Sequence, residues 1–288
     1  MNDARPVLSD LVIDDASFRF IADLVAENAG IALEPSKKAL VQGRLSRRLR
    51  TLGMESFRHY CRLLRQPDKQ GEIDTVINLI TTNLTRFFRE PHHFDHLTRS
   101  VLPEANRRAA LAGYRDARLR IWSAGCSTGQ EPYSIAMVVA RGLERASLWD
   151  ARVLATDIDT DSLAVAEEGE YAADELRHVP GELARRWLAP GARGRWRVVP
   201  ELAELVSFRA LNLMESWPMR GPFDVIFFRN VAIYFPRETQ VRMHRRMAAL
   251  LAPGGYLYLG HSESLRDETA GMTLVGKGIY RKQEDGAP

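Results

Sequence analysis

Polar residues that could hold a ligand follow several apolar runs of the sequence. The glycine-rich segment AGCSTG (124–129) follows the run 119–123, and Asp157 and Arg229 close two later runs. A glycine-rich turn between a strand and a helix lets a ligand approach the backbone. A carboxylate at the carboxyl edge of a parallel sheet can accept hydrogen bonds from both ribose hydroxyls. These residue types predict a nucleoside-binding site.

The glycine-rich segment lacks the features of two common nucleotide sites. It has neither the glycine spacing of a dinucleotide-binding loop nor the Gly-Lys-Ser/Thr ending of a phosphate-binding loop, and no lysine lies nearby. Glu131, near the expected helix start, would repel a pyrophosphate but could hold an amine or a ribose hydroxyl. We therefore expect a nucleoside without a phosphate chain. A tight turn that only packs a helix on a strand is the alternative.

Two of the candidate ligand residues also have structural explanations. An aspartate after a strand can cap a helix, but Asp159 and Asp161 are better placed for capping, which leaves Asp157 to a ligand. Asn212, followed by Leu213, supplies an amide that could read an adenine edge. A simple turn asparagine would have the same signature, so the sequence leaves both explanations of Asn212 open.

The spacing of apolar residues divides the chain into a helical part and an α/β part. Residues 1–81 carry only helix-period patterns, which predict a small helical bundle. From residue 119 onward, near-continuous apolar strands alternate with helices, which predicts a doubly wound, mostly parallel sheet covered on both faces. The expected strands are 119–123, 152–157, 223–228 and 255–259, and the expected helices are 131–144 and 237–251. Residues 82–118 are expected to form a linker, and residues 171–208 an inserted β-hairpin subdomain with strands at 196–199 and 205–208.

Length and composition exclude several classes of protein. A chain of 288 residues with 45% hydrophobic and 27% charged residues can form two globular domains. A net charge of +3 argues against a strongly basic nucleic-acid binder. Two cysteines make no disulfide framework, the N-terminus does not resemble a signal peptide, and no stretch approaches the ~18 apolar residues of a membrane span. We expect a soluble cytoplasmic protein without membrane insertion.

Five motifs, in order along the chain, carry a resemblance to one family. They are TNLTRFFRE (82–90), AGCSTGQEPYS (124–134), ATDID (155–159), FDVIFFRNVAIYF (223–235) and GHSES (260–264). The chain resembles the chemotaxis receptor methyltransferases, the CheR family, over almost its whole length. The resemblance implies a class I methyltransferase-like domain, with S-adenosylmethionine as cofactor and S-adenosylhomocysteine as product. It also implies methyl transfer to glutamates on the cytoplasmic helices of chemoreceptors.

The resemblance also implies roles for individual residues. The cofactor contacts would be Asn83, Thr85, Arg89, Glu131, Asp157, Asn212, Leu213, Arg229 and Asn230. The segment 83–89 would fold over the cofactor, and we expect Arg89 and Tyr234 to orient the acceptor and the cofactor. A buried ring with a satisfied hydroxyl is the structural alternative for Tyr234. Because a glutamate acceptor is already ionised at neutral pH, no general base is expected.

A basic stretch predicts where an acidic helical partner would dock. Nine basic residues lie between Ser36 and Gln66, against Glu55 alone. We expect a docking surface for the receptor's helical bundle formed by Lys37, Lys38, Arg44, Arg47 and Arg48, with a solvated basic face as the ordinary alternative. Some members of the family bind a receptor tail peptide at the inserted subdomain. The loop 188–196 looks shorter than in those members, which puts tail binding in doubt.

The sequence also offers a possible metal site and two alternative functions. His92, His93 and His96 suggest a metal site, but two histidines on one helix face, without a cysteine or a placed carboxylate, are a weak ligand set. We expect no metal. The same sheet could instead methylate RNA or a small molecule, with the basic stretch binding phosphate. A catalytically silent scaffold of the same fold is the other alternative, although the intact motifs favour an enzyme.

Overall fold

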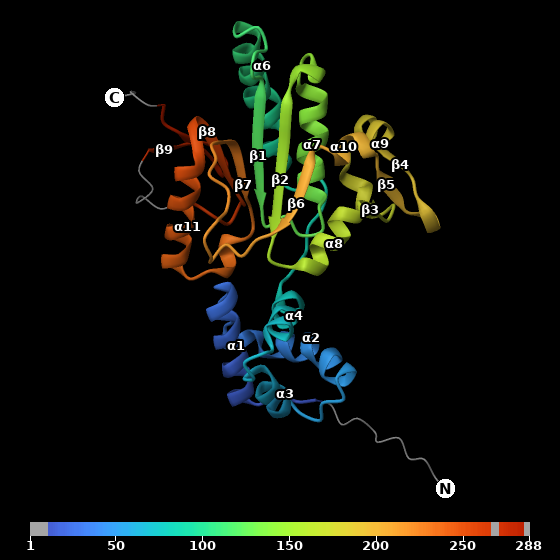
Figure 1. Cartoon of the computed structure of the whole chain (residues 1–288), viewed down its shortest axis with the longest axis vertical. Coiled ribbons are helices and arrows are strands. Elements are labelled where there is room, and N and C mark those ends of the chain that lie inside the picture. Colours follow the sequence, from blue (N-terminus) through green and yellow to red (C-terminus); the bar gives the residue numbers. More distant parts are fainter. Residues whose placement is uncertain (1–10, 266–270, 285–288) are drawn as a thin grey trace. The chain divides into compact units, whose positions relative to one another are not determined.

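The computed structural model describes residues 11–265 and 271–284. The chain divides between Thr82 and Asn83 into two compact units, which we call the helical unit and the α/β unit (Figure 1). Throughout the described ranges, each helix is either too short or too polar to cross a lipid bilayer.

Local capping sets the bounds of the helices in the helical unit. Asp14 accepts a hydrogen bond from the Ser17 backbone at the start of the first helix, Gly30 ends that helix with a φ of 71°, and Ser56 caps the third helix. The apolar faces of the helices meet in one core, so the predicted helical bundle is confirmed. The α-helices are α1 (Asp15–Ala29), α2 (Lys38–Thr51), α3 (Phe57–Leu64) and α4 (Gln70–Ile80).

The α/β unit is built on a seven-stranded sheet with the order β6-β2-β1-β7-β8-β10-β9. The first five of these strands run parallel, whereas β10 is antiparallel to both of its neighbours. The predicted doubly wound, mostly parallel sheet is confirmed. Its strands are β1 (Arg118–Ala124), β2 (Asp150–Asp157), β6 (Val206–Ala210), β7 (Phe223–Phe228), β8 (Leu251–Leu259), β9 (Met272–Gly276) and β10 (Ile279–Lys282).

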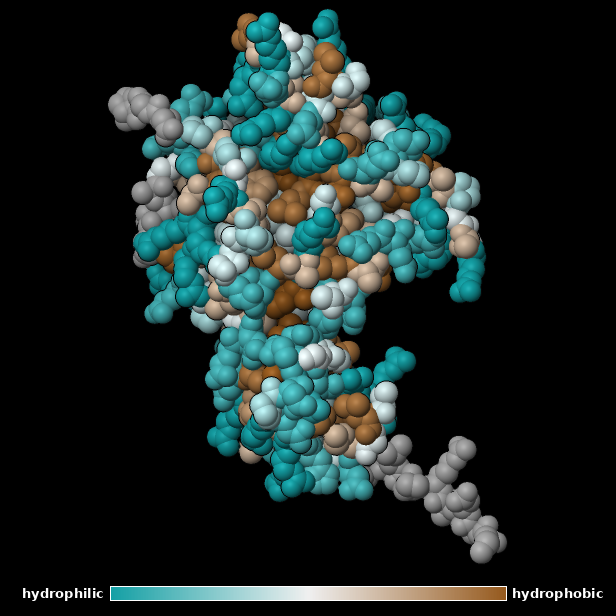
Figure 2. All heavy atoms as spheres, viewed as in Figure 1, coloured by the Kyte–Doolittle hydropathy of each residue, from teal (hydrophilic) through white to brown (hydrophobic). Residues whose placement is uncertain are grey.

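Helices cover the sheet and share its core. α7 (Gln130–Gly142) and α8 (Thr160–Glu168) pack against β2, and α11 (Arg237–Leu250) packs against β8 (Figure 1). Apolar side chains gather over the strands on the face of this unit that Figure 2 shows, with polar side chains around them. Short 3₁₀-helices lie at Pro35–Lys37, Ala146–Leu148, Glu175–His178, Ala192–Gly194 and Ala232–Tyr234.

The segment predicted to be a linker is part of the α/β unit. It forms α5 (Pro91–His96), a π-helical stretch (Leu97–Val101) and α6 (Leu102–Leu111). Phe87 and Phe94 are buried in the same core as the strands, and the Phe94 ring lies 5.9 Å from the Phe227 ring. Apolar residues at helix spacing therefore anchor this segment to the sheet.

The inserted subdomain differs from its prediction. It is a three-stranded antiparallel sheet of β3 (Glu170–Tyr171), β5 (Trp196–Val198) and β4 (Leu188–Pro190), with α9 (Gly181–Trp187) and α10 (Pro200–Ala203). The assignment of 205–208 to this subdomain is wrong, because Val206–Ala210 is β6, an edge strand of the large sheet. β6 pairs parallel to β2, and its Val206 and Phe208 side chains are buried in the main core.

Candidate functional site

The predicted ligand residues meet at the carboxyl edge of the large sheet. Glu131 lies in the first turn of α7, directly after the loop that follows β1, and Asp157 ends β2. Asn212 and Leu213 follow β6, and Arg229 follows β7. Because these strands are parallel neighbours, their carboxyl ends lie at the same edge. The sheet topology thus brings together residues that are far apart in sequence.

The glycines between β1 and α7 are required by the protein's own packing. Gly125 and Gly129 have φ values of 86° and 94°, which favour glycine. A Cβ on Gly125 would collide with Val231, and one on Gly129 would lie 2.6 Å from the Tyr171 hydroxyl. Conformation and packing therefore explain both glycines without a ligand. This agrees with the alternative explanation of the segment as a tight turn that packs a helix on a strand.

Asp157 is held by backbone donors and still has acceptor capacity. Its Oδ2 accepts a hydrogen bond from the Ser127 backbone at 2.7 Å, and its Oδ1 accepts one from the Asp159 backbone at 3.0 Å. Asp159, not Asp157, caps α8, as expected. Burial raises the pKa of Asp157. Because each carboxylate oxygen can accept a second hydrogen bond, Asp157 can bind two adjacent hydroxyl groups.

A buried guanidinium lies between two carboxylates at this edge. The Arg229 side chain is 1% exposed, with Nη1 3.0 Å from Glu131 Oε2 and Nη2 3.5 Å from Glu90 Oε2. Nη2 also donates to the Arg89 carbonyl. Burial raises the pKa of Glu131 although Arg229 opposes the shift, whereas at Glu90 burial is outweighed by Arg229 and His261, and the pKa is lowered. When ionised, two carboxylates face one cation here.

The segment before α5 lies against the glycine-rich loop. Asn83 Nδ2 donates to Asp159 Oδ2 at 2.5 Å, and its carbonyl accepts from Ser127 Oγ at 3.3 Å. Arg89 Nη1 donates to the Leu84 carbonyl at 3.0 Å, and Thr85 is half-buried. Asn83 thus lies beside residues that follow β1 and β2, and Arg89 belongs to the same segment. That this segment covers a cofactor stays a prediction.

Backbone strain is concentrated at the same edge. Phe88, Glu90, Ser127 and Asn230 are non-glycine residues with φ between 51° and 59°. Such conformations cost on the order of 1–3 kcal/mol each and persist where the surrounding structure fixes them. Two of them flank Arg89, which identifies this edge as the candidate functional site.

Three of the residues predicted to contact the cofactor or the acceptor form hydrogen bonds within nearby turns or have few described contacts. Asn212 Oδ1 accepts a hydrogen bond from the Met214 backbone at 3.0 Å, which is the turn explanation. The Leu213 carbonyl accepts hydrogen bonds from Trp217 Nε1 at 3.2 Å and from an arginine of α11 at 2.8 Å. Tyr234 is half-buried in the short 3₁₀-helix Ala232–Tyr234. Adenine contact by Asn212 and acceptor orientation by Tyr234 stay predictions.

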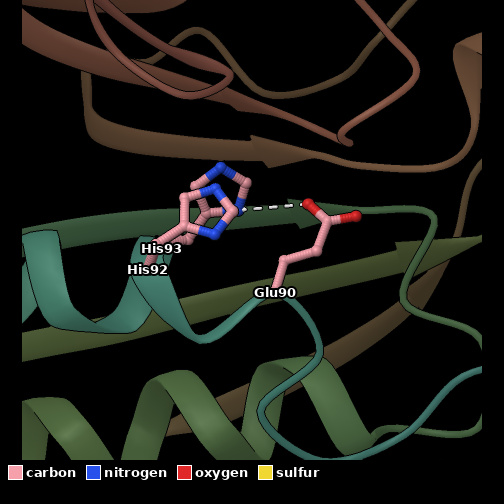
Figure 3. Close-up of side chains that lie close together, drawn as sticks. All are labelled: Glu90, His92 and His93. Atoms are coloured by element: carbon pink, nitrogen blue, oxygen red, sulfur yellow. Dashed lines mark ion pairs between the residues drawn. The ribbon is translucent and has the colours of Figure 1, made fainter.

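In α5, His92 and His93 lie close to Glu90, whereas the sequence suggested a group of histidines alone. Nε2 of His92 and Nε2 of His93 lie 3.0 and 3.1 Å from the Lys277 carbonyl, and His93 Nδ1 lies 3.6 Å from Glu90 Oε2 (Figure 3). His96 Nδ1 instead lies 2.7 Å from the Tyr258 hydroxyl. Burial lowers the pKa of His93 to about 3. One possible ligand atom from each of Glu90, His92 and His93 lies within 4.8 Å of the others, and the absence of a metal stays a prediction.

Glu263 is a residue of the site that sequence reasoning missed. Its carboxylate accepts hydrogen bonds from three backbone N–H groups, those of Asn230, Ile233 and Gly260. Two of these belong to the loop that carries Asn230 and Tyr234. The motif 260–264 marked the position, but no chemistry followed from its residue types.

The basic residues predicted to dock a partner have unequal roles. Arg44 donates to the carbonyls of Ile80 and Thr81 at the end of α4. Arg48 forms two hydrogen bonds with Glu72, at 2.9 and 2.5 Å. Lys38 pairs with an aspartate of α1 at 2.5 Å, whereas Lys37 and Arg47 are exposed. Arg44 and Arg48 therefore stabilise the helical unit itself.

Comparison with known proteins matches both units to one family. Residues 83–280 match the CheR methyltransferase, SAM binding domain, and residues 16–81 match the CheR methyltransferase, all-alpha domain. A probable chemotaxis protein methyltransferase of Rhizobium etli is 43% identical over 85% of this chain and 91% of its own length. The chemotaxis protein methyltransferase of Escherichia coli is 42% identical over 96% and 93%. Since these matches cover nearly all of the chain, it belongs to the CheR methyltransferase family.

Proposed function

We propose that this protein transfers the methyl group of S-adenosylmethionine to glutamate side chains of a chemoreceptor and forms methyl esters there. The relatives are named chemotaxis protein methyltransferases, and a receptor is the protein substrate that such a name implies. The transfer would take place in the cytoplasm, on the receptor's helical bundle.

The observation that carries the proposal is an excess of buried negative charge at the carboxyl edge. Asp157, Glu131 and Glu90 lie there, and Arg229 is the buried cation between two of them. S-adenosylmethionine supplies a methyl group on a positive sulfur and also carries one ammonium and one carboxylate, so it is a net cation. Asp157 would bind the ribose hydroxyls, and Glu131 would favour the positive end of the cofactor.

Positioning is the main task left to the protein. A glutamate acceptor has an ordinary pKa of about 4.3 and is ionised at neutral pH, so its oxygen attacks without a general base. Arg89 gives one hydrogen bond to the Leu84 carbonyl, and a guanidinium has five N–H donors. Arg89 would use its other donors to hold a carboxylate, and Tyr234 would orient the acceptor. Orientation of this kind can supply several kcal/mol, up to about 7–11 kcal/mol in favourable cases.

Lys37 and Arg47 are the residues that we propose to test for receptor docking. Both are exposed, and hydrophilic side chains cover most of the visible face of the helical unit (Figure 2). Reversing both charges with Lys37→Glu and Arg47→Glu should weaken receptor methylation and leave cofactor affinity unchanged. Arg107→Glu with Arg115→Glu, at exposed positions of the α/β unit, is the matched control for net charge. Equal methylation by the two double variants would refute docking at Lys37 and Arg47.

Methyl-labelled cofactor tests the function directly. The protein is incubated with the labelled cofactor and a lysate of its source cells, and the label is followed to protein, RNA and small molecules. We expect label on a protein band, released as methanol by mild base, and none with the Asp157→Ala variant. Label in RNA with a steep salt dependence, or in a small molecule, would replace the receptor as substrate. Cofactor binding without transfer would indicate a silent scaffold.

A second assay tests whether the receptor's tail peptide is needed. Methylation is compared for the receptor with and without its tail.

A further inference from the structure

A single carboxylate joins the ends of β7 and β8. Glu263 Oε2 accepts hydrogen bonds from the Asn230 backbone at 2.8 Å and from the Gly260 backbone at 2.7 Å. Glu263 Oε1 accepts a third from the Ile233 backbone at 3.3 Å. Charge-assisted hydrogen bonds of this kind are about twice as strong as neutral ones. Glu263 therefore fixes the backbone of the loop between β7 and α11 at two points.

The contact at Asn230 leaves little freedom. Asn230 has a φ of 59°, in the left-handed region that few non-glycine residues adopt. A Cβ on Gly260 would lie 2.5 Å from Asn230 Nδ2 and 2.9 Å from Glu263 Oε2. The amide of Asn230 thus packs directly on the Gly260 backbone, beside the carboxylate that holds its own N–H group. The strained backbone at Asn230 is set by Glu263 and Gly260 together.

The same turn is also tied to the segment that carries Arg89. Glu90 Oε1 lies 3.1 Å from His261 Nδ1 and accepts a hydrogen bond from the His261 backbone at 3.3 Å. Glu90 Oε2 lies 3.5 Å from Arg229 Nη2. The turn 260–263 therefore contacts the loop after β7 through Glu263 and the strained segment 88–90 through His261. These two segments carry the two residues expected to orient the acceptor and the cofactor, Arg89 and Tyr234.

We propose that Glu263 is a positioning residue for methyl transfer. It acts through the loop 229–234, holding Asn230 and Tyr234 in the geometry that the reaction needs, and it does not touch the reacting atoms itself. This inference rests on the proposed function. A displacement of about 1 Å at a reacting group can cost on the order of 100-fold in rate. We therefore expect Glu263→Ala to lower kcat by about 100-fold.

The variants separate positioning from folding. Glu263→Gln keeps one acceptor oxygen, which can serve the Asn230 and Gly260 N–H groups, but its amide would face the Ile233 N–H group. It should restore kcat to a value between wild type and Glu263→Ala. Glu238→Ala, at an exposed position in the first turn of α11, is the matched control and should behave as wild type. The KM for the receptor should change less than kcat, because docking uses the helical unit.

Hydrogen exchange measures the same bonds without catalysis. In Glu263→Ala, the backbone amides of Asn230 and Ile233 should exchange faster, while those in the middle of β1 keep wild-type rates. Wild-type exchange and wild-type kcat in a folded Glu263→Ala protein would overturn the inference. The inference would also be overturned if the fall in kcat were accompanied by faster amide exchange throughout the α/β unit, because that would indicate a general structural role. If the wild type transfers no methyl group to protein, the proposed function fails, but faster exchange at Asn230 and Ile233 would still establish the loop contact.

Discussion

Buried charge is used differently in the two units of this protein. In the helical unit, Glu72 accepts hydrogen bonds from both Arg48 and the Tyr60 hydroxyl, the latter at 2.6 Å. In the α/β unit, one buried cation serves two carboxylates, and Arg229 Nε, Glu90 Oε2 and His93 Nδ1 have no hydrogen-bond partner among the described residues. A satisfied network specifies packing, whereas an incompletely satisfied one retains capacity for a ligand.

Backbone strain follows the same division. Every non-glycine residue with a positive φ in the ranges 11–265 and 271–284 belongs to the α/β unit, and four of the eight lie at the candidate site. The helical unit, by contrast, uses glycine where it needs this conformation, at Gly30 and Gly53. The comparison indicates that the helical unit is optimised for stability and the sheet edge for binding and positioning. Four experiments test this difference between the two units.

The largest effect is expected from removing the buried cation. In Arg229→Met, Glu131 and Glu90 lose the charge that faces them, and removing one partner of a buried ion pair typically costs about 3–5 kcal/mol. We expect the free energy of unfolding of the α/β unit to fall by that amount and binding of S-adenosylhomocysteine to disappear. All five tryptophans lie in this unit, so urea unfolding followed by tryptophan fluorescence reports on it.

Arg237→Met is the matched control, because Arg237 is exposed at the start of α11. It should keep wild-type stability and cofactor affinity. If Arg229→Met were as stable as this control and still bound S-adenosylhomocysteine, Arg229 would be neither a structural cation nor a cofactor contact.

A smaller effect, confined to stability, is expected in the helical unit. Arg48→Met leaves Glu72 with the Tyr60 hydroxyl alone, and an unsatisfied, partly buried carboxylate costs about 1–3 kcal/mol. Circular dichroism should detect earlier unfolding of the helices, while tryptophan fluorescence and S-adenosylhomocysteine affinity stay unchanged. Arg50→Met, at an exposed position of the same helix, should leave all three as in wild type. Loss of cofactor affinity in Arg48→Met would contradict the division between the units.

The sequence predicted those parts of the molecule that local chemistry determines. Gly30 and Ser56 mark helix ends because capping depends on one side chain or one φ angle. The strands β1 and β7 could be found from their apolar residues, because most of the positions in each strand are buried. Asp157 could be assigned to the sheet edge because Asp159 already explained the helix cap.

Other parts depend on contacts that no local pattern reveals. β9 was not predicted because its residues Leu274 and Val275 are 60% and 48% exposed at the edge of the sheet, so that the strand has no buried face. The sequence places Arg44 in a docking surface or, as the alternative, on a solvated basic face, yet its side chain binds carbonyls 36 and 37 residues further along the chain. Glu263 acts on backbone N–H groups, which every sequence has, so only the folded loop reveals its role.

Acid should affect the two units in different pH ranges. Burial raises the pKa of Asp157 above its usual 3.8, so this carboxylate takes up its proton at a higher pH than an exposed aspartate does. On acidification, binding of S-adenosylhomocysteine should therefore weaken by several-fold before the helical unit is affected. At Glu72 burial is outweighed by Arg48 and Tyr60, which hold its pKa below 4.5. Its stabilising contribution is present above that pH and lost below it. Calorimetry at a series of pH values follows cofactor binding, and circular dichroism follows the helices. Unfolding of the helices at a higher pH than the loss of S-adenosylhomocysteine binding would contradict this order.

The smallest effect, none at all, is expected from metal removal. Glu90, His92 and His93 have donor atoms close enough for a metal, but Arg229 lies 3.5 Å from Glu90 Oε2 and already opposes its charge. Both imidazoles also lie within hydrogen-bond distance of the Lys277 carbonyl through Nε2. A divalent cation would add charge beside a buried guanidinium, which is unfavourable. Methyl transfer should therefore be the same before and after treatment with a chelator. A metal site would instead be established if activity fell with the chelator and returned with zinc alone, and if the His93→Gln variant responded to neither. The unpaired buried atoms of Glu90 and His93 would then be metal ligands.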